Sequence, residues 1–386
     1  MAGAVEASLL GLPAPPFGTG PFWSAMTDID TQTSPQADPP QAASADAAAA
    51  HDALARDANP VLVEATRGAM VESRHRGAFA VVDVEGRVIA SAGDTERPIY
   101  ARSAIKPLQA IPLVESGAAE AFGLGDAEIA LACASHRGEP RHVETVTAWL
   151  ARIGCSVADL ECGAHLPSDP AALAELLGAR GSPHAAHNNC SGKHSGFLTL
   201  ARHLGLPTQG YIRFEHGVQQ RVLGALEAMT GLDLGAAPRG VDGCGIPVIG
   251  VPLGNLALAM ARLADPADQP EPRQAACARI RAAMAAEPFM ISGTGRFCTR
   301  VISETGGRAL VKTGAEGVYC GALPGDGLGI ALKIDDGTGR AAEVAMAGLL
   351  ARFGLLDARH EFCAPRLSNR AGAVVGELRP PAGGPI

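Results

Sequence analysis

The chain has 386 residues, of which 47% are hydrophobic, enough for the core of one large domain or of two closely packed ones. Its formal net charge of -8 at pH 7 argues against nucleic acid as the main partner. No apolar run reaches membrane-spanning length, and the start lacks the basic and apolar pattern of a secretory signal. The nine cysteines form no C-x-x-C pair, so we expect reduced thiols and a cytoplasmic protein.

Residues 1–58 are rich in Ala, Pro, Ser, Thr and Asp and have no hydrophobic periodicity. We expect them to form a disordered extension, in which Met26 is an alternative start. Ordered structure is predicted from about Pro60. Runs of apolar residues predict a strand at 61–64 and a β-hairpin with strands at 78–83 and 87–92.

Helices dominate the next part of the chain, where Gly and Pro separate apolar, helix-periodic segments. The predicted helices are 104–116, 126–134, 141–153, 170–179, 195–203, 215–230, 253–264 and, after a Pro-rich linker, 273–286. Short apolar runs then predict antiparallel strands at 309–313, 317–322 and 329–334, followed by a helix at 341–353.

This order of elements predicts an α+β fold in one domain at 59–364. Strands from 60–100 and 305–355 are expected to join one antiparallel sheet with flanking helices. The intervening segment, about 104–290, is expected to form an all-helical lobe. The Pro- and Gly-rich residues 365–386 are expected to be a loose tail.

The stretch Arg102-Ser103-Ala104-Ile105-Lys106-Pro107 lies where the first strands meet the helices. Residues three apart share a helix face, so Ser103 and Lys106 are expected side by side. A serine hydroxyl becomes a nucleophile when a base takes its proton, and a desolvated lysine is such a base. The alternative is an N-cap serine with a surface lysine. Because Pro107 clashes with the Ser103 carbonyl in a regular helix, Ser103 is expected at an element boundary.

Two further stretches carry a serine and a lysine. Cys133-Ala134-Ser135-His136 ends a predicted helix, where Ser135 is either a second acid–base hydroxyl or a capping group. Lys312-Thr313-Gly314 ends a predicted strand and matches the lysine-threonine-glycine box of penicillin-recognising enzymes, which also use Ser-x-x-Lys. A lysine on an edge strand is usually solvated. The presence of both motifs in the right order favours a functional role.

The densest polar cluster is 187–196, with the sequence HNNCSGKHSG. We predict a binding loop here, in which Asn189, Lys193 and His194 donate hydrogen bonds to a small polar substrate and glycines let the backbone approach it. A second Gly-flanked turn at 241–247 carries Asp242. This carboxylate is predicted to accept an α-ammonium group, with an ordinary Asx-turn as the alternative.

Cys190, Lys193 and Cys244 are candidate ligands of a soft divalent ion. Two thiolates suit Zn²⁺, but a lysine amine must first lose a proton. From this chemistry alone, two buried thiols without a metal would be favoured.

Taken together, these stretches resemble the rhizobial-type, thermolabile L-asparaginases of the asparaginase II family. The matching strings cover residues 60 to about 355 in order: ARSAIKPLQA, ALACASH, RHVETVTAWLARIG, ECGAHLPSD, NNCSGKHSG, VDGCGIP, SGTGRFC, VKTGAEG and ALKIDDG. The resemblance implies a serine β-lactamase-like fold, hydrolysis of L-asparagine and a homodimer. It also implies a role for each matching position. Ser103 with Lys106, and Ser135 with Lys312, match two catalytic Ser–Lys pairs; Cys190, Lys193 and Cys244 match zinc ligands; Arg102, His194 and Asp242 match substrate-pocket positions.

We therefore expect an amidohydrolase that releases ammonia and L-aspartate from L-asparagine through an acyl-enzyme on Ser103. Ser135 is the alternative nucleophile. Two other functions remain open from the sequence. One is a penicillin-recognising hydrolase, which the lack of an export signal and of a clear Ser-Asp-Asn box disfavours. The other is a non-catalytic amino-acid sensor, which would not need the Ser–Lys pairs.

Overall fold

The computed structural model describes residues 59–386, so the expectations for 1–58 and Met26 lie outside the described residues. The strands are β1 (Val61–Arg67), β2 (Met70–Val82), β3 (Val88–Ala92), β4 (Pro98–Tyr100), β5 (Arg239–Val241), β6 (Pro247–Pro252), β7 (Leu310–Thr313), β8 (Val318–Leu323), β9 (Leu328–Ile334), β10 (Arg366–Ser368) and β11 (Val374–Arg379).

The α-helices of the same range are α2 (Lys106–Gln109), α3 (Ile111–Glu115), α4 (Ala118–Ala121), α5 (Asp126–Ala132), α6 (Pro140–Arg152), α7 (Pro170–Gly178), α8 (Ser191–His203), α9 (Gly217–Thr230), α10 (Leu253–Ala264), α11 (Glu271–Ala286), α12 (Pro288–Ser292), α13 (Phe297–Glu304) and α14 (Gly339–Arg352). Three short 3-10 helices are η2 (Arg102–Ile105), η3 (Val157–Asp159) and η4 (Ala185–His187). None of the helices described has the length and apolarity that crossing a bilayer requires.

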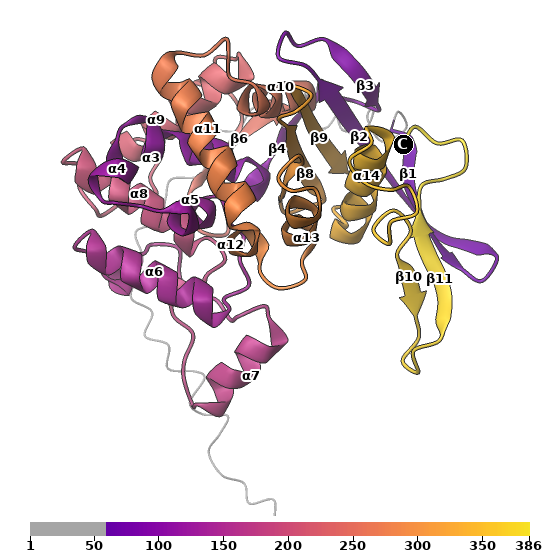
Figure 1. The fold of residues 1–386 in the computed structure, drawn as a ribbon, viewed down its shortest axis with the longest axis horizontal. Coiled ribbons are helices and arrows are strands. Elements are labelled where there is room, and N and C mark those ends of the chain that lie inside the picture. Colours follow the sequence, from indigo (N-terminus) through magenta and orange to yellow (C-terminus); the bar gives the residue numbers. More distant parts are fainter. Residues whose placement is uncertain (1–58) are drawn as a thin grey trace, which may run out of the picture. The chain divides into compact units, whose positions relative to one another are not determined.

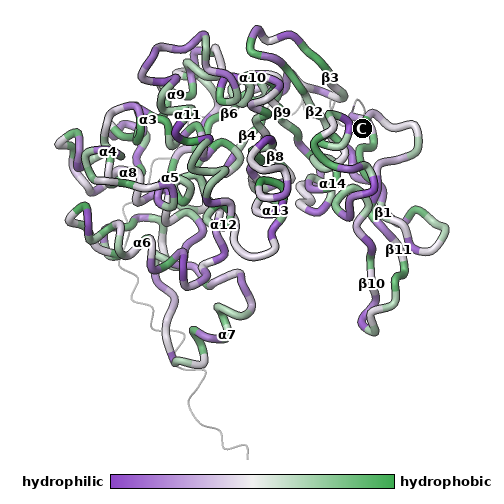
Figure 2. The backbone as a smooth tube through the Cα atoms, in the orientation of Figure 1, coloured by the Kyte–Doolittle hydropathy of each residue, from purple (hydrophilic) through white to green (hydrophobic). Residues whose placement is uncertain are grey.

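The main sheet joins strands from both ends of the described chain. Its order is β10-β11-β1-β2-β9-β8-β7, and β3 pairs with the second half of β2. Antiparallel pairing of β2 with β9, in which Phe79 lies opposite Leu332, connects the early strands to the late ones. Hydrophobic residues follow β2, β8, β9 and α10 through the centre of the fold (Figure 2). The two predicted strand groups therefore form one sheet.

Helices α10 and α14 cover opposite faces of this sheet (Figure 1). A side chain at Gly329 of β9 would meet the backbone of α10, whereas one at Gly321 of β8 would face Met346 of α14. Gly321 lies opposite Ile330, the neighbour of Gly329, and successive residues of a strand point to opposite faces. Glycine at position 329 lets α10 lie directly against the strand, because any Cβ there would overlap its backbone.

The helices from α2 to α12, apart from α10, gather beside the sheet as the expected lobe (Figure 1), whereas α13 packs on the sheet through Phe297, which contacts Tyr319 of β8. The α+β plan of an antiparallel sheet with flanking helices and a helical lobe is confirmed. The lobe is not all-helical, however. Its residues 239–252 form β5 and β6, which build a three-stranded antiparallel sheet with β4.

The C-terminal segment also differs from the loose tail expected at 365–386. β11 pairs with β1, with Leu378 opposite Ala65, and β10 pairs with β11. The Pro- and Gly-rich composition concealed this strand. Gly376 is required there because a Cβ at this position would overlap the carbonyl of Thr66 in β1.

Candidate active site

Ser103 lies in η2, the turn that follows β4 and precedes α2. The preceding residue, Arg102, has a φ of 51°, in the left-handed region that non-glycine residues rarely adopt. Pro107 stands at the start of α2, and the helix predicted at 104–116 is divided into η2, α2 and α3. The expected position of Ser103 at an element boundary is confirmed.

The head of Lys106 is directed at Ser135 rather than at Ser103. Its Nζ donates to Ser135 Oγ at 3.0 Å, to the carbonyl oxygen of Asn189 at 3.4 Å, and to that of Ala134. The N–H of Lys106 donates to the Ser103 carbonyl, but within residues 59–386 no hydrogen bond joins the two side chains. The side-by-side contact expected from the three-residue spacing is therefore not formed, because the 3-10 turn and the buried acceptors draw the amine toward Ser135.

Lys312 approaches the same hydroxyl from the end of β7. Its Nζ donates to Ser135 Oγ at 2.8 Å and to the carbonyl oxygen of Thr313 at 2.7 Å. Although β7 is an edge strand of the sheet, the residue is completely buried, unlike the usual solvated edge lysine. Burial, together with the positive charge of Lys106, lowers the pKa of Lys312 to about 7. Ser135 thus lies between two buried lysines, one of which is readily neutral near pH 7.

The HNNCSGKHSG cluster is the start of a helix rather than a loop. Residues from Ser191 onward belong to α8, which begins four residues earlier than predicted. A Cβ at Gly192 would overlap the carbonyl of Leu131 in α5, so this glycine permits close packing of two helices. The cluster's side chains are consequently held inside the protein instead of on a mobile segment.

The three candidate metal ligands converge at this end of α8. Lys193 Nζ donates to Cys244 Sγ at 3.0 Å, and the thiols of Cys190 and Cys244 are hydrogen-bonded to each other. The contact with Cys244, which outweighs burial, lowers the pKa of Cys190 well below its ordinary value. Burial alone would lower the pKa of Lys193, but its interactions with Cys190 and Cys244 raise it. In the part of the chain described, no group of three or more His, Cys, Asp or Glu side chains is arranged to hold a metal.

His194 is completely buried, and burial lowers its pKa well below the ordinary value. Its Nδ1 lies 2.7 Å from the hydroxyl of Tyr211, which also accepts from the N–H of Glu161 at 2.8 Å. The Tyr211 proton must therefore point to Nδ1, which puts the imidazole proton on Nε2. That Nε2–H has no hydrogen-bond partner among the described residues. Tyr211 was not foreseen from the sequence because it belongs to none of the motifs; only its rarity, as one of three tyrosines, marks it.

Arg102 and Asp242 form an ion pair across the site. The Arg102 guanidinium reaches Asp242 Oδ1 at 2.8 Å from Nε and at 2.6 Å from its terminal nitrogen. Burial would raise the pKa of Asp242, but Lys193 and Arg102 together lower it. The two charges predicted to bind opposite ends of a substrate are thus already adjacent and bonded to each other.

Asn189 contributes a backbone carbonyl, which accepts from Lys106 Nζ and from the N–H of His136. No hydrogen bond of its side-chain amide occurs within residues 59–386. All eleven candidate residues therefore lie on segments that meet between the sheet and the lobe: η2 and α2, the loop after α5, the start of α8, the β5–β6 turn and the end of β7.

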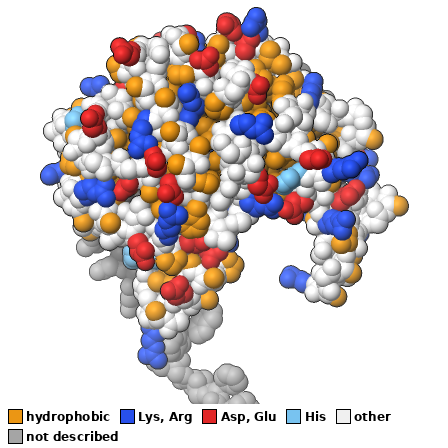
Figure 3. Space-filling view, viewed as in Figure 1, with side chains coloured by type: hydrophobic (Ala, Val, Ile, Leu, Met, Phe, Trp, Pro, Cys, Tyr) orange, Lys and Arg blue, Asp and Glu red, His pale blue; other side chains and the backbone are white. Residues whose placement is uncertain are grey.

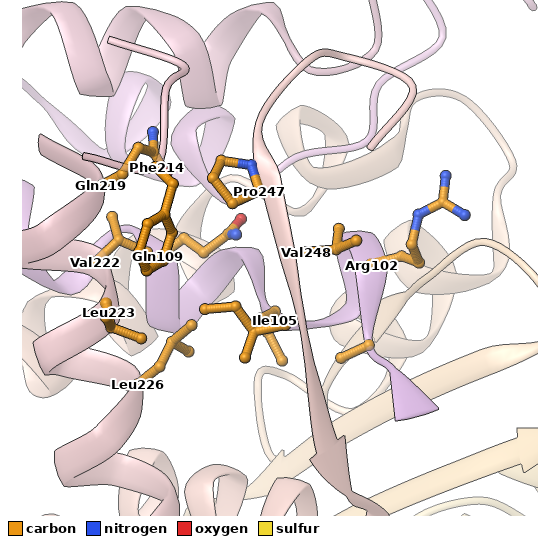
Figure 4. Close-up of a pocket in the computed structure, with 12 residues that line it drawn as sticks. Arg102, Ile105, Gln109, Phe214, Gln219, Val222, Leu223, Leu226, Pro247 and Val248 are labelled. Carbon is orange, nitrogen blue, oxygen red and sulfur yellow. The ribbon is translucent and has the colours of Figure 1, made fainter. Parts of the chain in front are cut away.

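A separate apolar pocket lies behind the Ser103 turn (Figure 4). It encloses about 410 Å³ of empty space, part of it open to solvent, among residues of η2, α2, α9 and β6. The guanidinium of Arg102 points away from its other labelled residues (Figure 4). Neither Ser135 nor either catalytic-candidate lysine lines this pocket, so it is not the place where the proposed chemistry would occur.

Solved structures overlap with this chain only loosely. A native form of Mglu is 15% identical, with a TM-score of 0.43 over 80% of this chain and 72% of its own. A β-lactamase from Mycobacterium bovis is 16% identical, with a TM-score of 0.36 over 72% of this chain and 95% of its own. Simvastatin synthase from Aspergillus terreus is 13% identical, with a TM-score of 0.32 over 67% of this chain and 86% of its own. At these TM-scores the likenesses carry no argument about function.

No curated protein sequence matches the chain. The sequence model of one family, described as L-asparaginase II, does match residues 63–380. This span contains both Ser–Lys pairs, the Cys190–Lys193–Cys244 cluster and the Arg102–Asp242 pair, and it includes nearly the whole described fold. The chain belongs to the L-asparaginase II family.

Proposed function

We propose that this protein is an amidohydrolase that converts L-asparagine to L-aspartate and ammonia through a serine acyl-enzyme. The observation that carries the proposal is the contact of Ser135 with both buried lysines. Burial of a charged lysine destabilises the folded protein, and buried groups with shifted pKa values are concentrated at functional sites. The pKa of Lys312, about 7, suits proton transfer at neutral pH. Family membership supports the amidohydrolase class, and the choice of L-asparagine is part of the proposal.

In this proposal Ser103 attacks the side-chain amide carbon of the substrate. Lys106 first passes a proton through the Ser135 hydroxyl to the neutral amine of Lys312 and so becomes neutral itself. When bound substrate brings the Ser103 hydroxyl within reach of this amine, Lys106 accepts the Ser103 proton as the new C–O bond forms. When the C–N bond breaks, that proton goes to the leaving nitrogen, and ammonia departs; water then hydrolyses the Ser103 ester, which releases L-aspartate and returns the proton to Ser103. Because the first N–H groups of a helix have no intrahelical acceptor, the backbone at the start of η2 is a suitable oxyanion hole.

Substrate recognition is proposed to use the Arg102–Asp242 pair. An α-amino acid carries a carboxylate and an ammonium group on one carbon, and an adjacent guanidinium and carboxylate complement both. Two nearby side chains with unused hydrogen-bonding groups could also contact the substrate. The free Nε2–H of His194 and the amide of Asn189 would hydrogen-bond polar atoms of the substrate.

We also propose that Zn²⁺ binds Cys190, Lys193 and Cys244. Two thiols and an amine already converge there, and the pKa of the Cys190 thiol is markedly lowered. This donor set fits a zinc site with one position left open. A bound Zn²⁺ would supply a Lewis acid that orients the substrate. The residues themselves join the start of α8 to the β5–β6 turn. A homodimer in the cytoplasm completes the proposal, to be checked by light scattering and cell fractionation.

A coupled ammonia assay with L-asparagine tests the activity directly. Ser103→Ala should lower the rate by several orders of magnitude, as loss of a nucleophile does. If Ser103→Ala kept more than about a tenth of the wild-type rate, Ser103 would not be the nucleophile. Trapping the acyl-enzyme and mapping the labelled peptide distinguishes the serines, since a label on Ser135 would reverse the assignment.

Two other outcomes would replace the proposal. Turnover of a chromogenic cephalosporin without ammonia release from L-asparagine would assign a penicillin-recognising hydrolase. Tight L-asparagine binding without ammonia release would assign a sensor.

A further inference from the structure

His136, the residue after Ser135, has both ring nitrogens engaged in hydrogen bonds. Its Nδ1 accepts from the N–H of Gly138 at 3.1 Å, and its Nε2 lies 2.8 Å from Ser191 Oγ. Ser191 donates its own proton to the carbonyl oxygen of Ala186 at 3.0 Å, so the Nε2–H must be the donor to Ser191. The ring is thus a neutral imidazole in one defined tautomer, and neither nitrogen is free to reach Ser135.

The glycine in this arrangement is required. Gly138 has a φ of 71°, and a Cβ there would lie 3.1 Å from the carbonyl oxygen of His187 and 3.2 Å from Cα of Pro167. Only a residue without a side chain can therefore turn its N–H toward the His136 ring.

Aromatic stacking holds the same ring from the other direction. His136 stacks on His142 with centroids 4.8 Å apart and planes 15° apart, and His142 stacks on Phe289 at 4.6 Å and 6°. Both histidines are buried, and burial lowers the pKa of each. The three rings connect the loop after α5 to α6 and α12.

The backbone on either side of the Ser135 side chain is fixed by the same elements. The N–H of Ser135 donates to the carbonyl oxygen of Ile291 in α12 at 2.9 Å, and the N–H of His136 donates to that of Asn189 at 3.3 Å. The Asn189 carbonyl also accepts from Lys106 Nζ at 3.4 Å. Displacement of the His136 ring would therefore move Ser135 and one of its lysines together.

We propose that His136 is a positioning residue: its two hydrogen bonds and its stack on His142 and Phe289 hold the Ser135 hydroxyl between Lys106 and Lys312. This inference rests on the proposed serine chemistry, which gives the position of Ser135 its importance. It assigns the histidine beside the serine a role without proton transfer.

The test compares His136→Phe, which keeps an aromatic ring but loses both hydrogen bonds, with His136→Gln, whose amide can still donate to Ser191. A small misplacement of a reacting group costs roughly 10- to 100-fold in rate, so His136→Phe should lower kcat by that factor with little change in KM. His136→Gln should recover to within about fivefold of wild type, the factor that one hydrogen bond is worth. Its pH–rate profile should keep the fall on the acidic side at its wild-type position.

His75→Phe is the matched control, because His75 is also buried and hydrogen-bonded, to Asp336 at 2.6 Å, but lies in β2 outside the site. It should lower the melting temperature and leave kcat unchanged. If His136→Phe does not fold, His142→Leu carries the test: it removes the stack and should lower kcat severalfold at constant KM.

Three results would overturn the inference. The first is a wild-type kcat in His136→Phe or, where that variant does not fold, in His142→Leu. The second is a His136→Gln variant as impaired as His136→Phe. The third is loss or displacement of the acidic fall in the pH–rate profile of His136→Gln. Hydrolysis of p-nitrophenyl acetate by the same variants separates this inference from the proposed substrate. A wild-type protein that cleaves this ester but not L-asparagine would refute only the substrate, and the ester rates would then decide the role of His136. A wild-type protein that cleaves neither would refute both.

Discussion

Replacing Lys312 by methionine should make the protein inactive and more stable. The pKa of Lys312 is lowered from its ordinary value of 10.5 to about 7, chiefly by burial. Between these two pH values the unfolded chain binds more protons than the folded one, so wild-type stability rises with pH across that window. Below pH 7 the folded protein bears the full cost of the buried charge, on the order of 4–5 kcal/mol.

The Lys312→Met variant removes that cost but also removes two hydrogen bonds. Losing the bonds to Ser135 and to the Thr313 carbonyl costs about 1–2 kcal/mol in total, part of it from the carbonyl left without a donor. The variant should therefore exceed wild type in unfolding free energy by roughly 2–4 kcal/mol at pH 6, and the gain should disappear by about pH 10. Ammonia release should fall by about 10²- to 10⁴-fold, as for loss of an acid–base group.

Urea unfolding at pH 6, 8 and 10 measures the stability change, and the buried Trp149 is a fluorescent probe of the core. Lys333→Met is the control for activity: Lys333 is a partly buried lysine of β9 whose amine donates to the main-chain carbonyls of Glu316 and Ile334 and not to any candidate site residue, so its loss should leave kcat unchanged. A Lys312→Met variant that was less stable than wild type at pH 6, or whose stability difference did not depend on pH, would refute the reasoning.

Further predictions concern the same site. Ser135→Ala should lower kcat by about 10²-fold or more while KM stays nearly constant, because it breaks the link between the lysines; an unaffected kcat would exclude the relay. In wild type, kcat/KM should fall as pH drops through about 7, where Lys312 gains its proton and the pair becomes doubly charged; a flat profile from pH 5 to 8 would contradict this. Asp242→Asn should raise KM for L-asparagine roughly 10- to 100-fold, since Arg102 loses its partner and the ammonium loses its acceptor; steady-state kinetics give the comparison, and an unchanged KM would reject the recognition scheme. Dialysis against a strong chelator should lower the melting temperature and raise KM more than it lowers kcat, with both restored by Zn²⁺; elemental analysis that found no zinc in wild type, or the same content in Cys244→Ala, would remove the metal from the proposal.

The sequence predicted the regular core elements well because they are apolar segments bounded by Gly, Pro and polar residues. Residues 253–264 form α10 at the predicted bounds, and the hairpin of β2 and β3 follows its two apolar runs. The strands that were missed carry Gly and Pro for close backbone contacts, as in β6 and β11, and local composition does not reveal which backbone they approach. Figure 3 shows acidic and basic side chains interspersed on the visible face.

The motifs supplied the candidate residues that the fold brings together, but they did not reveal the contacts of those residues. Sequence spacing paired Lys106 with Ser103, whereas the fold directs its amine to Ser135, a residue of another segment. The Arg102–Asp242 ion pair likewise joins positions 140 residues apart. Such contacts depend on how the lobe packs against the sheet. The same applies to the ring stack of His136, a loop residue whose partners come from α6 and α12.

The order of strands in the main sheet has a consequence for synthesis on the ribosome. β1, β2 and β3 emerge first and can pair with one another, but β2 also needs β9 and β1 also needs β11. At roughly 5–20 residues per second, the roughly 250 residues between β2 and β9 take tens of seconds to translate. During that interval the apolar half of β2, including Phe79 and Val81, presents an unpaired edge. The nascent chain is therefore a natural client for chaperones, and it cannot complete its fold until its last strand has left the exit tunnel.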